Sequence, residues 1–183
     1  MNIISKVKTK DSTTANITAS MSIKDSFKFK NPVKVECIGP DGVVKWVEEG
    51  YNLVTTQGLE DILDVYFSDG SQDATHYIGL KGTGAVAVGD TLASHANWTE
   101  VTDYTGNRKA WTEAGVSSKA ITNSASPASF AIDDTATVAG AFLTNAETGT
   151  DGILVAAIDF TASRSVLSGD TLNVTYSLTI ADA

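Results

Sequence analysis

The sequence predicts a mainly β protein: an antiparallel β-sandwich or jelly-roll-like domain, with one short α-helix at about residues 56–67 and a basic N-terminal arm. Short runs in which apolar and polar residues alternate recur from residue 33 onward, separated by clusters of Gly, Asn, Asp and Ser. Apolar residues at helical spacing mark a single segment. With 183 residues, one such domain can bury a substantial core without disulfides.

We divide the chain into an extended basic arm, residues 1–30, and a single β-sandwich domain, residues 31–183. The arm is rich in Lys, Ser, Thr and Asn, and its one periodic feature is the alternation from Ile17 to Ile23. We therefore expect at most one strand in the arm, ordered only when something binds it.

Charge separates the arm from the rest of the chain. Seven lysines and two aspartates lie within residues 1–34, a net charge of +5, which leaves −14 for the remainder of a chain whose total is −9. An acidic body repels nucleic-acid phosphates, whereas a basic arm is attracted to an acidic surface, either a partner's or another copy's. A solvated tail is the alternative. The candidate partner-binding residues are Lys6, Lys8, Lys10, Lys24, Lys28 and Lys30.

The domain begins with a predicted β-hairpin. Val33, Val35 and Cys37 alternate with polar residues, Gly39–Gly42 supplies a turn, and an apolar run that ends at Val47 follows.

The predicted helix comes next, with a start at Thr55–Gly58. Its acidic residues suit the positive end of the helix dipole, and Ser68–Gly70 ends it. Its apolar and acidic residues fall on opposite faces: Leu59, Ile62, Leu63, Tyr66 and Phe67 against Glu60, Asp61 and Asp64.

Strands separated by turns are expected from residue 75 to the end. They lie near residues 77–80, 98–101, 110–113, 116–122, 128–133, 136–144, 152–160 and 170–180. The last one alternates from Leu172 to Ile180, so one face should be buried and the other wet. Gly-Asp-Thr-Leu occurs at 89–92 and again at 169–172. We interpret both copies as a tight turn that leads into a strand. Gly supplies an unusual backbone angle, and the Asp side chain hydrogen-bonds to the backbone of the turn.

We interpret the residues that could form a catalytic, metal or phosphate-binding site as structural. Cys37 is interpreted as a small buried hydrophobe, because no basic or histidine neighbour would lower its pKa. His76 and His95 lack the spacing of a zinc-protease motif, and we expect both to be hydrogen-bonded structural groups. No serine stands in a G-x-S-x-G elbow. Gly79–Gly84 lacks the ending of a phosphate-binding loop and is interpreted as a flexible turn.

Several aspartates near glycine turns are interpreted as turn formers, since none falls in a calcium-loop pattern: Asp69, Asp73, Asp133, Asp134, Asp151 and Asp159. An ion shared between loops or subunits is the alternative. Trp46, Trp98 and Trp111 are assigned to the core, with interface contacts as the alternative. We predict no catalytic residue, no cofactor and no metal. Nucleic-acid binding is not predicted, because the arm has only Phe27 and Phe29 as aromatic residues.

The segment from Tyr51 to Ala183 resembles a family of small structural proteins of tailed bacteriophages. The phrases that carry the resemblance are NLVTTQGLEDILDVYF, THYIGLKGTG, GDTLASHANWTEVTDY, RKAWTEAGVSSKAITNSASPASFAID, TATVAGAFLTNAETGTDGILVAAIDF and SVLSGDTLNVTYSLTI. Members are labelled as minor structural, head decoration or tail-associated proteins. The resemblance implies a virion component with no active site to carry over.

From the resemblance we expect a capsid decoration or cement protein on the outer head shell, made in the host bacterial cytoplasm. Its partners would be the major capsid protein and neighbouring copies of itself, in a homo-oligomer such as a trimer. A membrane role is not expected, because no apolar run approaches the roughly 20 residues of a spanning helix. A tail, baseplate or fibre component is the first alternative. A carbohydrate-binding module with exposed Trp98, Tyr104 and Trp111 is the second, and a hydrolase is the third.

Overall fold

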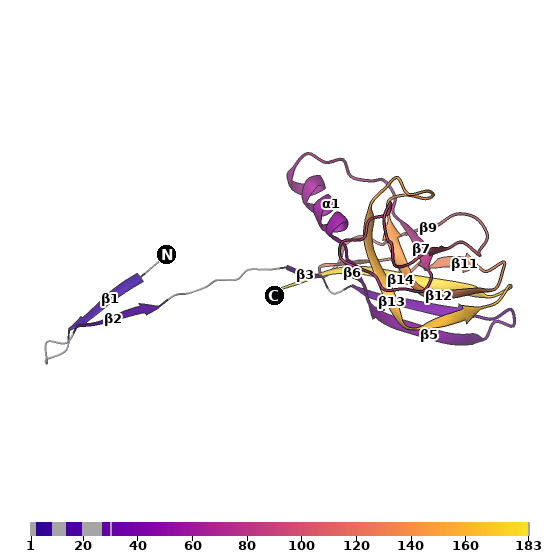
Figure 1. The fold of residues 1–183 in the computed structure, drawn as a ribbon, viewed down its shortest axis with the longest axis horizontal. Helices are drawn as coiled ribbons and strands as arrows, with labels where there is room; N and C mark the ends of the chain where they lie inside the picture. Colours follow the sequence, from indigo (N-terminus) through magenta and orange to yellow (C-terminus); the bar gives the residue numbers. More distant parts are fainter. Residues whose placement is uncertain (1–2, 9–13, 20–26, 30, 183) are drawn as a thin grey trace.

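Two antiparallel sheets face each other in the computed structural model, which describes residues 3–8, 14–19, 27–29 and 31–182 (Figure 1). The first sheet has the order β10-β14-β4-β5, with β3 and β11 also paired to β14. Its strands are β3 (Phe27–Phe29), β4 (Pro32–Ile38), β5 (Val44–Tyr51), β10 (Ala120–Thr122), β11 (Ala128–Ala131) and β14 (Thr171–Asp182).

The second sheet has the order β6-β13-β12-β7-β8, with β9 also paired to β7. Its strands are β6 (Leu53–Val54), β7 (Tyr77–Lys81), β8 (Glu100–Val101), β9 (Lys109–Ala110), β12 (Ala136–Thr144) and β13 (Leu154–Val166). One helix, α1 (Thr56–Phe67), lies in the described part of the chain. The predicted mainly β sandwich with one short helix is confirmed.

Strand β14 shows how the sequence alternation builds the core. Leu172, Val174 and Tyr176 are fully buried, as the alternation predicts. The burial ends further along the strand, where Ile180 is exposed and pairs with Phe29 of β3. The pairing of β14 with β4 on one side and with β10 and β11 on the other makes it the centre of the first sheet.

The predicted hairpin is present as β4 and β5. Gly42 adopts a φ of +77°, and its N–H donates to the carbonyl of Gly39 at 2.9 Å. The Asp41 carboxylate accepts a hydrogen bond from the Val43 N–H at 3.1 Å. A glycine and an aspartate therefore close the turn, as expected from their turn chemistry.

The two Gly-Asp-Thr-Leu copies form the same turn. In the second copy, the Asp170 N–H donates to the Leu167 carbonyl and the Leu167 N–H donates to the Asp170 carboxylate, both at 3.0 Å. Asp90 and Ala87 make the same pair of bonds in the first copy. Two details of the prediction are wrong: only the second copy leads into a strand, and only its glycine, Gly169, has a positive φ, +89°.

The arm contains more structure than the sequence predicted. β1 (Ile3–Lys8) pairs with β2 (Thr14–Ala19) in an antiparallel hairpin, so the expectation of at most one strand in the arm is wrong. The hairpin lies apart from the two sheets (Figure 1). β3 joins the first sheet by pairing with the C-terminal end of β14. The alternation at Ile17 and Ala19 belongs to β2, whereas Met21 and Ile23 lie outside the described residues.

Candidate interaction surface

Helix α1 carries its apolar side chains on the outside of the molecule. Leu63 is 57% exposed, Tyr66 79% and Phe67 75%, and Leu59 and Ile62 are each 37% exposed. Gly58 is the one buried residue of the helix. The bounds of the helix agree with the prediction, but its apolar face is largely exposed. Exposed apolar patches of this kind typically mark interaction sites.

The N-terminal end of α1 is held firmly to the sandwich. The Thr55 hydroxyl caps the helix by accepting from the Gly58 N–H at 3.1 Å, and it also donates to the Leu154 carbonyl. A side chain at Gly58 would place its Cβ 2.2 Å from the carbonyl oxygen of Val155. The first helical turn holds no acidic residue, so the neutral Thr55 cap takes the place of the predicted dipole contact.

Gln57 adds a second attachment. Its side-chain oxygen accepts from the N–H groups of Leu92 at 3.3 Å and Leu154 at 2.8 Å, and its amide donates to the Gly152 carbonyl at 3.3 Å. The beginning of the helix is therefore fixed, while its later turns extend beyond the sheets (Figure 1).

A hollow of about 370 Å³ lies between α1 and the sandwich. Its apolar walls come from Ile62 and Tyr66 of the helix and from Trp111, Val155 and Leu178 of the body. On its Ile62 and Tyr66 side, the exposed face of α1 thus continues into a groove that reaches the sheets.

The polar part of this hollow is acidic. Asp61 and Asp73 line it together with His76, and no Lys or Arg is among the lining residues. Burial raises the pKa of Asp61, as do the nearby carboxylates of Asp73 and Asp64, while His76 opposes the shift. The hollow therefore favours a cationic group above an apolar floor.

The predicted lysines fall into two groups. Lys6 and Lys8 lie on β1 and Lys28 lies on β3. The other three, Lys10, Lys24 and Lys30, lie outside the described residues. Partner binding by these six lysines stays a prediction.

The register of β1 and β2 gives the hairpin two different faces. Ile3 pairs with Ala19, Ser5 with Ile17 and Val7 with Ala15, so five apolar residues share one set of register positions. Lys6 pairs with Asn16, Lys8 with Thr14 and Ile4 with Thr18 at the alternate positions, which are therefore mostly polar. The hairpin is therefore amphipathic by register.

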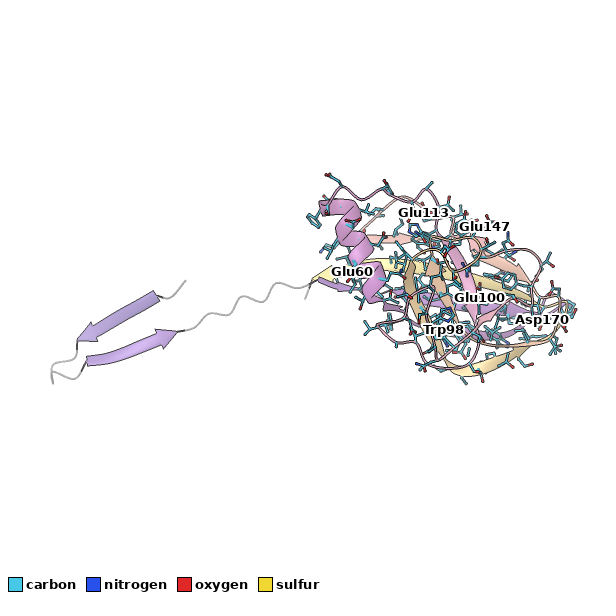
Figure 2. All side chains as sticks on the ribbon, turned by 45° about the horizontal axis from the view of Figure 1, so that its top comes forward. Glu60, Trp98, Glu100, Glu113, Glu147 and Asp170 are labelled. Atoms are coloured by element: carbon cyan, nitrogen blue, oxygen red, sulfur yellow. The ribbon has the colours of Figure 1, made fainter. Side chains whose placement is uncertain are left out.

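The aromatic residues suggested for a glycan platform lie inside the molecule. Trp98 is 3% exposed, and Tyr104 and Trp111 are each 4% exposed. The Trp98 ring N–H donates to the buried Asp90 carboxylate at 2.9 Å, and the Trp111 ring N–H donates to the Tyr176 carbonyl at 2.9 Å. A carbohydrate site built on these three exposed rings is therefore wrong, and Figure 2 shows Trp98 within the body. Their assignment to the core is confirmed for Trp98 and Trp111.

Cys37 and His95 have the expected structural surroundings, whereas among the described residues His76 has a ring contact in place of the expected side-chain hydrogen bond. Cys37 is buried, and burial together with the charge of Asp170 raises the pKa of its thiol to about 11. His95 stacks on Trp98, and its Nδ1 lies 2.9 Å from the Trp98 carbonyl oxygen. His76 meets the Trp111 ring edge-on. Across the described residues, no group of three or more His, Cys, Asp or Glu side chains is placed to hold a metal ion.

The glycine-rich turn after β7 is packed rather than flexible, which corrects the prediction. Lys81 is fully buried; its ammonium pairs with Asp159 at 2.8 Å and donates to the carbonyls of Gly82 and Gly84. A Cβ at Gly84 would meet the Asn97 carbonyl oxygen at 1.8 Å. The sequence contained no local signal for this buried lysine, because Asp159 is distant in the chain.

None of the described helices is long and apolar enough to span a bilayer. No protein-family model matches the chain, and no curated protein is similar to it in sequence.

Proposed function

We propose that the protein is a non-catalytic structural component of a tailed-bacteriophage virion, a decoration or cement protein that binds the outer shell of the head. The observation that carries the proposal is the basic hairpin set apart from an acidic sandwich. The sequence resemblance to phage structural proteins supports the choice of particle.

The charge distribution explains how such attachment would work. Lys6 and Lys8 occupy the polar register positions of the hairpin, where they would contact acidic groups of the shell. An isolated two-stranded hairpin is at best marginally stable in water, so a docking surface would also stabilise the arm. Copies joined in one oligomer would add their individually modest attractions to the shell.

The test is co-sedimentation of the full chain with heads that lack it, and separately with isolated tails, at increasing salt. We expect saturable binding to heads that weakens as salt screens the charges. The charge-neutralised variant K6Q/K8Q should bind more weakly, whereas the matched body variant K34Q/K109Q should bind like the parent. In the body, Lys34 pairs with Glu36 and Lys109 with the Thr105 carbonyl.

Binding to tails alone would instead favour the tail, baseplate or fibre alternative. Binding to neither particle, or equal weakening by both pairs of substitutions, would contradict attachment through the arm.

A further inference from the structure

We propose that the exposed face of α1 and its hollow bind the N-terminal arm of a second copy of this chain. The first argument is the exposure of Leu63, Tyr66 and Phe67. Tyr66 lines the hollow that leads to the sheets, and Leu63 and Phe67 line a second hollow beside Ile153. The rings of Tyr66 and Phe67 contact each other edge-on with centroids 4.8 Å apart, which gives a partner two adjacent aromatic anchors.

The charge around this face identifies the kind of occupant. α1 carries Glu60, Asp61 and Asp64 and no lysine or arginine, and Asp73 lies in the adjoining hollow. Two α1 helices packed together would bring like charges close, which disfavours a helix-to-helix dimer. A segment that is both apolar and basic fits the surface better.

The arm of the chain has both properties. One set of hairpin register positions holds Ile3, Val7, Ala15, Ile17 and Ala19, which suits the apolar face of α1. The arm also carries a net positive charge, which attracts it over longer range toward the acidic side of α1. With its apolar face on α1, the hairpin keeps the Lys6 and Lys8 positions on its other side for a shell surface.

The position of β3, where the arm joins the sandwich, favours the exchange of arms between copies. β3 pairs with β14 at Ile180–Asp182, and Leu178 of the same strand lines the hollow. α1, β3 and the C-terminus lie at one end of the sandwich, from which the hairpin extends away (Figure 1). When copies meet at this end, the arm of each copy can bind α1 of the next copy. Such contacts close a symmetric ring.

Sedimentation velocity of the full chain over a concentration series tests this exchange. We expect the wild type to form a closed oligomer. Removal of residues 1–26 should give a monomer; the core side chains begin at Phe29, so the truncated chain keeps the whole described core. The double variant Y66S/F67S, at two exposed positions, should weaken self-association by about 30-fold or more.

V43S is the matched control, because Val43 is 60% exposed in the β4–β5 turn. This turn lies beside Gly169, whose added Cβ would be 3.2 Å from Pro40. Figure 2 shows neighbouring Asp170 at the far end of the body from Glu60 of α1. We expect V43S to assemble like the wild type.

Mixing the two defective chains gives the decisive result. The truncated chain keeps an intact α1, and Y66S/F67S keeps an intact arm, so together they should form a heterodimer through one arm at concentrations where each chain alone is monomeric. A monomeric wild type, a Y66S/F67S oligomer as strong as wild type, or no heterodimer would overturn the proposal. The inference does not rest on head binding, so a protein that fails to bind heads would leave this test unaffected.

Discussion

Asp170 holds together three segments at the end of the sandwich that lies far from α1. Its carboxylate is 1% exposed, accepts from the Lys45 ammonium at 2.6 Å and from the Leu167 N–H at 3.0 Å, and lies 3.7 Å from the Cys37 sulfur. These contacts connect β4, β5 and the turn into β14. A buried carboxylate of this kind is stabilising only while its partners remain.

We therefore expect D170N to lower the free energy of unfolding more than D90N does, because the amide loses the charge that balances Lys45. D90N, in the first Gly-Asp-Thr-Leu turn, is the matched comparison. The Asp90 carboxylate accepts from Trp98 and Ala87 N–H groups, which an amide oxygen can still satisfy in part. Urea denaturation of both variants measures the difference, and an equal loss would contradict the role given to the Lys45 pair.

The same carboxylate predicts how stability depends on pH. Burial by itself would raise the pKa of Asp170, but the hydrogen bonds from Lys45 and Leu167 outweigh it and lower the pKa. The pKa of Glu48 is likewise lowered, because bonds from Thr161 and Arg164 outweigh burial. A lowered folded-state pKa gives stability that is present above about pH 4 and lost as the pH falls further. Denaturation at stepped pH should show this loss, and D170N should show less of it.

At the scale of elements, the attachment of α1 depends on Gly58. The Cβ of an alanine at this position would press on the Val155 carbonyl, which belongs to β13 and cannot move freely. We expect G58A to cost about 1–3 kcal/mol and to speed hydrogen exchange in α1. G115A, whose Cβ meets nothing within 4 Å, should stay within about 0.5 kcal/mol of wild type. Unchanged exchange in G58A would contradict the tight contact.

Helix α1 also shows what local sequence can predict. Its bounds followed from the apolar spacing and the Thr55 cap, both of which are local. The exposure of Leu63 and Tyr66 did not follow, because an amphipathic pattern is the same whether the apolar face meets the core or a partner. Buried Lys81 escaped prediction for a related reason: its partner Asp159 is brought near by the pairing of β7, β12 and β13.

The whole molecule combines an acidic sandwich with a basic hairpin. The exposed apolar face of α1 lies at the end of the sandwich where the arm joins it. The sheet class was predictable because strand alternation reports burial directly. The pairing of β1 with β2 was not, because the arm's alternation is short and Lys-rich. The surface on α1 requires the folded structure, since Trp111 of the loop after β9 and Leu178 of β14 complete it.

The most direct test of cementing is the temperature at which heads disrupt with and without bound protein. We predict that heads lacking the protein become more heat-resistant when the full chain saturates them, and that the chain without residues 1–26 gives no such rise. No rise at saturation, or an equal rise with the truncated chain, would contradict a cement protein that acts through its arm.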